Sequence, residues 1–388
     1  MIRIVHVISG LGTGGAEMML CRLLSRMDQE HYENVVISLT DMGTLGRQIE
    51  SLGIRVYTLG PRKESTTPTM GAMRSLPLLF VGLWKLTVLL KRQRPQILQT
   101  WLYHADLLGL LAGRLAGVPT IVWNLRCTES NEHRKLAMSL LSRMSRYPDA
   151  ILVNSLAGRR YHEERGYRTK SWVHIPNGID VEMFRPDSNA RRQVREELGV
   201  GRECLLIGLI GRNHPLKDIE TFLRAASFIH SECPDAHFVM VGLGLDKQNA
   251  ILVELVVQLK LAPYVHLLGR RDDIPRLSSS FDIGVLSSCA EGFPNVVGEM
   301  MACGVPCVVT DVGDAGFLVG GTGRIVLPKS SAALGKACLE VIAEGSEGRR
   351  MLGEKARSRI MECFDLRLIV HRYEALYSSL FTRGVSQS

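Results

Sequence analysis

The chain has 388 residues, of which 46% are hydrophobic and 22% charged, and its formal net charge is +8 at pH 7. This length exceeds the roughly 250 to 300 residues at which a single hydrophobic core usually stops growing, so we expect two domains. Aromatic residues make up only 6% of the chain, and no base-reading module occurs, which argues against a nucleic-acid partner.

Cysteine usage and apolar runs exclude other classes of protein. The nine cysteines form no C-x-x-C pair and are odd in number, which fits neither a disulfide framework nor a zinc site and indicates a reducing cytoplasm. The N-terminal stretch MIRIVHVISG reads directly as a strand, without the features of a signal peptide. The longest apolar run, residues 76–90, contains Lys85 and is shorter than the about 20 residues of a membrane span. We therefore expect a soluble or peripheral protein.

The excess positive charge lies in the first half of the chain. Residues 1–183 hold 23 Lys and Arg against 15 Asp and Glu, whereas residues 184–388 hold 24 of each kind. Some of the basic residues lie beside apolar helical stretches at 76–94 and 132–147. This combination suits a surface that binds anionic lipid headgroups. A core helix with a solvated basic end is the alternative.

Strand-like runs alternate with helical patterns along the chain. Short apolar runs separated in this way indicate parallel sheets covered by helices on both faces. The pattern restarts after residues 180–190, which predicts two Rossmann-like α/β domains, 1–183 and 184–388, facing across a cleft. The helical stretch 364–381 falls in the second range, and the alternative is that it packs back against the first domain. The expected strands are 2–9, 34–39, 54–59, 96–100, 120–125, 150–155, 172–177, 205–211, 237–242, 265–269, 283–288 and 306–310.

A glycine-rich turn follows the first strand-like run, in HVISGLGTGGAEMM. Gly10, Gly12 and Gly15 give the spacing G-x-G-x-x-G, which is typical of dinucleotide-binding turns that meet a phosphate at a helix start. Asp41, after the next strand, would be the ribose-binding acid of that arrangement. The first hypothesis is therefore an NAD-dependent dehydrogenase.

The second half contains the stretch SSCAEGFPNVVGEMMACGVPCVVTD, residues 287–311. Glu291 and Glu299 are eight residues apart, and Pro294 stands where a helix would begin. Both carboxylates could then face a ligand at the helix start, together with the N–H groups of the first turn around 295–297. The alternative is that these acids merely oppose the helix dipole.

Here the chain resembles the family 4, or group 1, retaining glycosyltransferases of the GT-B fold. The motif E-G-F-P-N-x-x-x-E matches, as do GTGGAE near the start, PNGID at the domain junction, GR followed by Lys217, and VGLG at 241–244. The resemblance spans essentially the whole chain. It implies an enzyme that uses a nucleotide sugar, with the glycine turn facing a diphosphate and with no cofactor role for Asp41.

The resemblance also implies roles for single residues. Arg212 and Lys217 would hold the donor diphosphate, where fixed cations stabilise the leaving group. Glu299 would bind the ribose hydroxyls, and Glu291 the hydroxyls of the donor sugar. His104 would lie beside the transferred sugar, and Arg126, at a position where the family often has histidine or an acid, would contact acceptor or phosphate. Glu17 belongs to the GTGGAE motif, and its alternative role is only to cap a helix. The remaining donor-binding positions are Gly14, Gly15, Gly211, Gly244, Phe293, Asn295 and Val296.

The family further implies a front-face substitution with retention, in which the leaving phosphate accepts the proton of the acceptor. The chain has no D-x-D triplet, so we expect neither a metal nor any other cofactor. The expected donor is a UDP-sugar, with GDP-mannose as the competitor. The expected acceptor is a lipid-linked oligosaccharide or a lipopolysaccharide or exopolysaccharide intermediate at the inner face of the cytoplasmic membrane. A sugar-nucleotide epimerase, a non-catalytic nucleotide-sugar binder and the NAD-dependent dehydrogenase are the alternatives.

Overall fold

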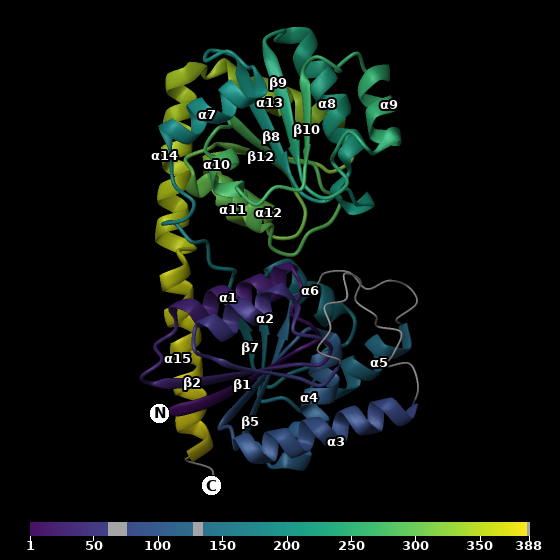
Figure 1. Cartoon of the computed structure of the whole chain (residues 1–388), viewed down its shortest axis with the longest axis vertical. Coiled ribbons are helices and arrows are strands. Elements are labelled where there is room, and N and C mark those ends of the chain that lie inside the picture. Colours follow the sequence, from purple (N-terminus) through teal and green to yellow (C-terminus); the bar gives the residue numbers. More distant parts are fainter. Residues whose placement is uncertain (61–75, 127–134, 386–388) are drawn as a thin grey trace. The chain divides into compact units, whose positions relative to one another are not determined.

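The computed structural model describes residues 1–60, 76–126 and 135–385, and for residues 76–79, 135–137 and 384–385 it describes the backbone alone. The chain divides into two compact units (Figure 1). The first unit comprises residues 1–178 together with 366–388, and the second comprises residues 179–365. Each unit is built around one parallel sheet.

The first unit contains a seven-stranded sheet with the order β3-β2-β1-β4-β5-β6-β7, and each neighbouring pair is parallel. Val5 at the centre is paired with Val35 on one side and with Leu98 on the other. The strands are β1 (Ile2–Ile8), β2 (Tyr32–Ser38), β3 (Arg55–Thr58), β4 (Ile97–Trp101), β5 (Thr120–Leu125), β6 (Ala150–Val153) and β7 (Trp172–His174). The helices are α1 (Gly15–Arg26), α2 (Gly43–Ser51), α3 (Leu76–Gln93), α4 (Tyr103–Ala116), α5 (Lys135–Met144), α6 (Leu156–Glu164) and α15 (Leu366–Val385).

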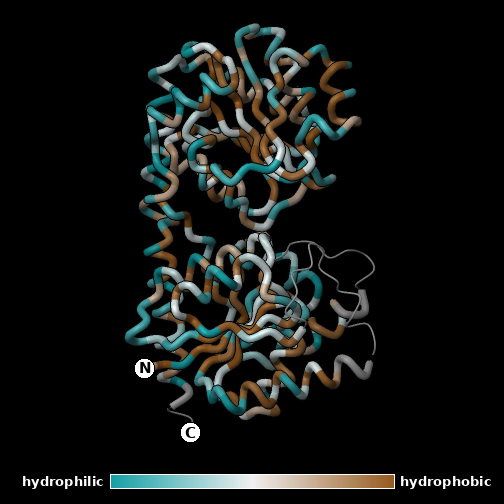
Figure 2. Tube along the Cα trace, in the orientation of Figure 1, coloured by the Kyte–Doolittle hydropathy of each residue, from teal (hydrophilic) through white to brown (hydrophobic). Residues whose placement is uncertain are grey.

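Two apolar cores cover the two faces of this sheet. On one face α1, α2 and α15 bury side chains such as Leu20, Ile49 and Tyr373, and on the other α3, α4 and α5 bury side chains such as Leu86, Leu110 and Leu141. The strands alternate between these cores: Ile4 and Ile8 belong to the first, and Val5 and Val7 to the second. Figure 2 shows apolar residues concentrated along the strands of each unit.

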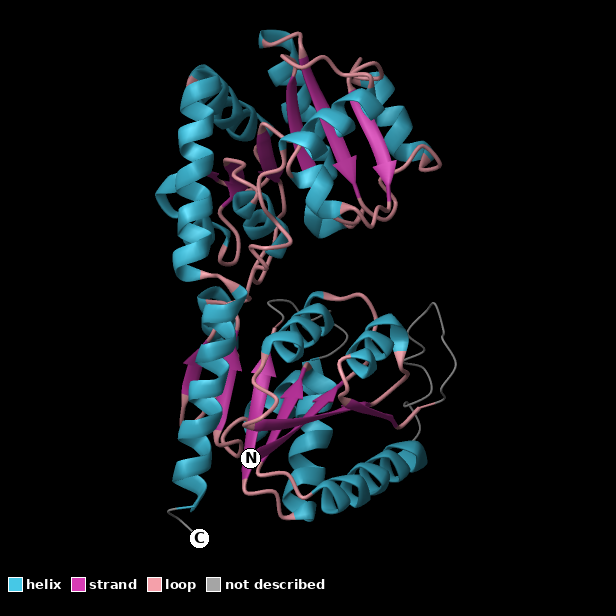
Figure 3. Cartoon of the chain, turned by 60° about the vertical axis from the view of Figure 1, so that its left-hand side comes forward, coloured by secondary structure: helices cyan, strands magenta, loops and turns pink. Residues whose placement is uncertain are grey.

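The second unit contains a six-stranded sheet with the order β10-β9-β8-β11-β12-β13, also parallel throughout (Figure 3). Helices α8, α9 and α13 cover one face, and α7, α10, α11, α12 and α14 contribute to the core on the other. The strands are β8 (Leu205–Ile210), β9 (Ala236–Val241), β10 (Val265–Gly269), β11 (Ile283–Leu286), β12 (Cys307–Thr310) and β13 (Arg324–Val326). The helices are α7 (Ser188–Leu198), η3 (Pro215–Lys217), α8 (Ile219–Glu232), α9 (Ala250–Gln258), α10 (Ile274–Ser278), α11 (Asn295–Ala302), α12 (Ala315–Val319), η4 (Gly320–Thr322), α13 (Ser331–Ala343) and α14 (Gly345–Cys363).

The strand orders place one topological switch point in each sheet. In the first sheet it lies between β1 and β4, and in the second between β8 and β11, where consecutive crossovers leave in opposite directions. Open parallel sheets bind ligands beyond the carboxyl ends of the strands at such points. The loops that follow β1, β4, β8 and β11 are therefore the places where sites are expected.

The twelve expected strands are present, and the structure adds β13, which the sequence analysis missed. The division into units also differs from the expected ranges of 1–183 and 184–388. The first unit ends at Gly178, and the terminal helix belongs to it rather than to the second unit. The reason is that α15 buries Ile369, Tyr373 and Tyr377 against the first sheet.

Two expectations from composition can be compared with the described residues. Among the described helices, none combines the length and the apolar character that a membrane span requires. The eight cysteines in this part of the chain are all free thiols, and Cys307 and Cys338 are among the buried ones.

We expect Tyr377→Phe to lower the free energy of unfolding by about 1 to 3 kcal/mol, because it leaves a buried acceptor without its partner. The Tyr377 hydroxyl donates to Gln99 Oε1 over 2.6 Å, and both residues are buried. Chemical denaturation of the full chain would measure the change. The control is Tyr147→Phe, at an exposed tyrosine of the same unit. Equal free energies of unfolding for the two variants would contradict the conclusion that the Tyr377–Gln99 hydrogen bond helps to hold α15 against the sheet.

Candidate active site

Two loops meet at the switch point of the second sheet. The loop after β8, residues 211–218, contains η3, and the loop after β11, residues 287–294, leads to α11. Ser287 Oγ donates to the carbonyl of Lys217 over 2.8 Å, and the Cys289 N–H donates to the carbonyl of Leu216 over 2.7 Å. These bonds hold the two loops together although about 70 residues separate them in the sequence.

The contact between these loops brings together two residues predicted from the sequence. Lys217 Nζ lies 2.5 Å from Glu291 Oε1, and the Ser288 hydroxyl donates to the same oxygen over 2.7 Å. The Lys217 side chain is 23% exposed and that of Glu291 13%, so the pair is only partly screened by solvent. A cation and a carboxylate in this position can bind phosphate oxygens and hydroxyl groups respectively. The pairing itself, and the part of Ser288 in it, were not foreseen from the sequence.

Gly211 and Gly244 lie where the chain turns beyond β8 and β9. The Gly211 N–H donates to the Val241 carbonyl at the end of β9 over 2.8 Å, and the Asn213 N–H donates to the Leu243 carbonyl over 2.7 Å, which ties the two turns together. Gly244 has φ +76°, and a Cβ there would lie 3.1 Å from the Cβ of Asn213. Arg212 is exposed, and no ion pair in the described part of the chain holds it. It lies in the same loop as Lys217.

Helix α11 begins at the position expected from Pro294, which is its N-cap. Asn295 and Val296 form the first turn, where the backbone N–H groups point toward the start of the helix. Glu299 lies in the second turn and is only 7% exposed. The Phe293 ring packs in the core with its centroid 5.7 Å from that of Phe364, so only the backbone of Phe293 is left for a ligand.

The loop after β12 adds a contact that the sequence analysis did not identify. Gly313 has φ +58°, and a Cβ there would lie 2.3 Å from the carbonyl oxygen of Glu291. The Asp314 N–H donates to the Gly292 carbonyl over 2.9 Å. The backbone around Glu291 is therefore supported by a third loop, and a glycine in that loop is the only sequence signal that could have indicated this contact.

In the first unit, the glycine-rich turn follows β1 as predicted. Gly14 is the N-cap of α1, and Gly15 is its first residue. The Glu17 side chain folds back over Gly14, and its Oε2 lies 2.2 Å from the position that a Cβ on Gly14 would occupy. Burial raises the pKa of Glu17, and the nearby charge of Arg126 acts in the opposite direction. Asp41 lies in the loop between β2 and α2.

His104 and Arg126 follow the two neighbouring strands β4 and β5. His104 is exposed in the first turn of α4. Arg126 donates from Nη1 to Asn177 Oδ1 over 2.5 Å and from Nη2 to the Tyr373 hydroxyl over 2.6 Å, and its Cζ lies 4.6 Å from the centroid of the Trp101 ring. The structure thus gives Arg126 a packing role that attaches α15 to the sheet. Its predicted contact with an acceptor, like the other assigned roles, stays a prediction.

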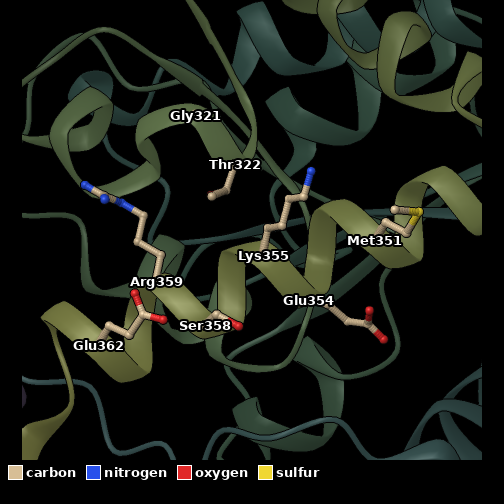
Figure 4. A pocket seen from close by; sticks show the side chains of 8 residues that line it. All are labelled: Gly321, Thr322, Met351, Glu354, Lys355, Ser358, Arg359 and Glu362. Atoms are coloured by element: carbon tan, nitrogen blue, oxygen red, sulfur yellow. The ribbon is translucent and has the colours of Figure 1, made fainter.

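Among the described residues, no group of three or more His, Cys, Asp or Glu side chains is arranged to hold a metal ion. A pocket of 420 Å³ lies between α14 and η4, lined by residues that include Thr322, Lys355 and Arg359 (Figure 4). None of the predicted site residues lines this pocket.

Comparisons with known proteins match both units. The family described as Glycosyltransferase Family 4 matches residues 13–183, and that described as Glycosyl transferases group 1 matches residues 204–344. EpsF of Bacillus subtilis is 29% identical over 323 residues, 80% of this chain and 79% of EpsF. The UDP-Gal:alpha-D-GlcNAc-diphosphoundecaprenol alpha-1,3-galactosyltransferase of Escherichia coli is 29% identical over 62% of this chain and 63% of its own length.

The fold has matches among solved structures. HepE from Anabaena, solved in complex with UDP, aligns with a TM-score of 0.81 at 23% identity, covering 97% of this chain and 100% of HepE. The same protein has also been solved with UDP-glucose, at a TM-score of 0.80. At this level of identity the likeness establishes the two-domain fold.

We expect Gly313→Ala to destabilise the loop that carries Glu291, because alanine is strained at φ +58° and its Cβ would overlap the carbonyls of Glu291 and Gly292. The melting temperature of the full chain would fall by several degrees, corresponding to about 1 to 3 kcal/mol. The matched control is Gly321→Ala, where a Cβ would meet nothing within 4 Å. A Gly313→Ala variant as stable as this control would show that the loop adjusts freely.

Proposed function

Because the chain belongs to the group 1, family 4 glycosyltransferases and has their GT-B fold, we propose that it transfers a hexose or N-acetylhexosamine from a nucleotide sugar to a hydroxyl group. The proposed acceptor is a lipid-linked oligosaccharide or a lipopolysaccharide or exopolysaccharide intermediate. The observation that carries the proposal is the approach of Lys217 to Glu291 at the switch point of the second sheet. No comparison supports the epimerase or dehydrogenase alternatives.

The proposed donor is a UDP-sugar. Two findings support it: the similar galactosyltransferase of Escherichia coli is named for UDP-Gal, and HepE has been solved with UDP and with UDP-glucose. The same galactosyltransferase is named for an undecaprenol-linked acceptor, which supports a lipid-linked acceptor here. GDP-mannose remains the competing donor.

Each proposed role follows from the chemistry of the side chain in its place. Lys217 and Arg212 neutralise the donor diphosphate, whose charge grows as it leaves. Glu291 accepts hydrogen bonds from the hydroxyls of the transferred sugar, and the buried Glu299 accepts them from the ribose. The amides at the start of α11 bind the remaining phosphate or sugar oxygens. In the first unit, Gly14, Gly15 and His104 serve the diphosphate and the reacting sugar.

We propose that the reaction retains the configuration at the anomeric carbon. The bond from that carbon to the diphosphate breaks, the bond to the acceptor oxygen forms on the same face, and the acceptor proton passes to the departing phosphate oxygen. The protein contributes position and electrostatic stabilisation. With Lys217 and Arg212 at the diphosphate, the proposed reaction needs no metal ion and no other cofactor.

The proposal predicts transfer from a UDP-hexose or UDP-N-acetylhexosamine to a lipid-linked acceptor, with release of UDP and with activity that persists in excess EDTA. A panel of UDP- and GDP-sugars with the purified chain, followed by NMR of the product anomer, would test the donor, retention and metal independence together.

Lys217→Ala should lower kcat about a hundredfold, more than it weakens donor binding, if the lysine acts mainly on the leaving group.

The control for this variant is Lys336→Ala, which removes an exposed lysine on α13 of the same unit. A changed sugar in the absence of acceptor would indicate an epimerase, and hydride transfer with NAD a dehydrogenase. Donor binding without turnover would reduce the chain to a binding protein. Equal activity of Lys217→Ala and Lys336→Ala would remove Lys217 from the mechanism.

We also propose that the first unit meets an anionic membrane surface through the exposed sides of α3, α4 and α5, at the inner face of the cytoplasmic membrane. Helices α3 and α4 pack against each other, and α4 contacts α5 (Figure 1). Phe80 and Trp84 on α3 are each 66% exposed, Leu115 on α4 is 60% exposed and Leu140 on α5 is 46% exposed. Neither α3 nor α5 contains an acidic residue. Residues 132–134 of the basic stretch noted in the sequence lie outside the described ranges.

We expect the chain to bind vesicles containing phosphatidylglycerol and to bind phosphatidylcholine vesicles far more weakly. Trp84 is the one exposed tryptophan among the four, so its fluorescence should shift to the blue on binding. The double variant Phe80→Ser with Trp84→Ser removes the exposed apolar side chains of α3 and should weaken vesicle binding. Lys85→Glu should weaken it about fivefold or more, because each basic residue near an anionic surface contributes about 1 kcal/mol to binding.

Sedimentation with vesicles measures both effects. Ile251→Ser with Val257→Ser, two exposed apolar residues on α9 of the second unit, provides the matched control. Identical sedimentation of all these variants would contradict the membrane surface, and the transferase assay with a water-soluble acceptor would be unaffected by that result.

A further inference from the structure

Leu102 has a backbone conformation that leucine rarely adopts. It is the N-cap of α4, and its φ of 75° and ψ of 154° fall in a region populated almost only by glycine. Asp218, the N-cap of α8, also has a positive φ, but its ψ of 57° places it in the left-handed helical region that polar residues tolerate. Leu102 therefore stores backbone strain at the turn from β4 to α4.

The residues on either side of Leu102 are anchored separately. The ring of Trp101 is fully buried, is stacked on that of Tyr373 at an interplanar angle of 12°, and donates from Nε1 to His6 Nδ1 over 3.3 Å. The Tyr103 hydroxyl lies 2.9 Å from His162 Nε2. Trp101 belongs to the core under α15, and Tyr103 to the core under α3 and α4, so the two rings extend to opposite faces of the sheet.

The histidine that holds Tyr103 is fixed in one protonation state. His162 Nδ1 lies 2.6 Å from the Gly158 carbonyl, which can only accept, so Nδ1 carries the proton and Nε2 accepts from the tyrosine. Burial lowers the pKa of His162 to about 4, which keeps the ring neutral at physiological pH. The anchor on this face is thus a single, stable arrangement.

The first turn of α4 is also attached to the end of β4. The Asp106 N–H donates to the Leu102 carbonyl over 2.9 Å, and the Thr100 hydroxyl donates to Asp106 Oδ1 over 2.5 Å. Asp106 is fully buried, and this burial raises its pKa well above the usual range. Residues 100–106, which we call the β4–α4 elbow, are therefore constrained on both faces of the sheet and along the helix. His104 is the exposed residue inside this constrained segment.

We infer that Leu102 is a positioning residue, whose strained backbone fixes the first turn of α4 so that His104 is held in one orientation for the transfer reaction. The inference rests on the proposed function, which places His104 beside the transferred sugar. Strain of this kind persists only where the surroundings over-determine it, and here Trp101 and Tyr103 supply the constraint from opposite sides. A glycine in place of Leu102 would adopt the same turn without strain, but would also allow others.

The test compares Leu102→Gly with Leu102→Ala, because both lose the side chain and only glycine loses the strain. At ordinary positions alanine is the more stabilising residue of the two, whereas here the glycine variant should have the higher melting temperature. The same variant should have a kcat about tenfold lower than the alanine variant, since small misplacements of a residue that positions the reacting sugar are costly. KM for the donor should be equal in the two variants. The more stable protein would then be the slower enzyme.

The matched control is the pair Lys260→Gly and Lys260→Ala. Lys260 also has a positive φ, of 58°, but lies between α9 and β10, at the edge of the sheet away from the site loops. Its glycine variant should again be the more stable, with kcat unchanged. Equal kcat values for the two Leu102 variants, or a melting temperature of Leu102→Gly below that of Leu102→Ala, would overturn the inference. The proposed function would still stand as long as the wild-type chain transfers sugar. A wild-type chain that transfers no sugar from any donor would overturn the proposed function and this inference with it.

Discussion

Each strand of the two sheets runs parallel to its neighbours, and this single constraint determines where chemistry can occur. A parallel strand must be followed by a crossover that returns the chain to the starting edge, so all carboxyl ends collect at the opposite edge. Residues that are distant in sequence then become neighbours there, as Lys217 and Glu291 do across the β8–β11 switch point. The same rule places the turn after β1 next to the elbow after β4 in the first unit.

Most of the fold could be predicted because buried parallel strands leave a clear trace, a short run of β-branched and apolar residues between helical patterns. Strand β13 leaves no such trace, since it has three residues at the edge of the sheet and Ile325 is exposed. The terminal helix was recognisable as a helix, but its place was not. An apolar face specifies that a helix is buried without specifying against which sheet, and α15 buries Tyr373 and Tyr377 in the unit farther away along the chain.

The candidate site, like the fold, could be predicted only in part. Motifs locate Lys217, Glu291 and Glu299, because these residue types recur at fixed spacings, but the ion pair of the first two depends on strand adjacency that spacing does not encode. Gly313 could have been suspected as a glycine, whereas the strain at Leu102 has no trace in the sequence, since the residue type alone does not reveal that a leucine has a positive φ. Arg126 looked like a ligand-binding cation, and the structure shows it attached to Asn177 and Tyr373. A charged residue that follows a strand therefore has two roles open to it, and only its neighbours distinguish them.

The placement of α15 has a consequence for the order in which the protein is made. The second unit is an uninterrupted stretch, residues 179–365, so all of its core has been synthesised before the last helix leaves the ribosome. The first unit, although residues 1–178 precede the second unit, lacks one covering helix until residues 366–385 emerge. Of the two units, the one that is started earlier is thus completed later. Until α15 has been synthesised, the apolar face that it covers, which includes Trp101 and Leu152, is open to the solvent and to chaperones.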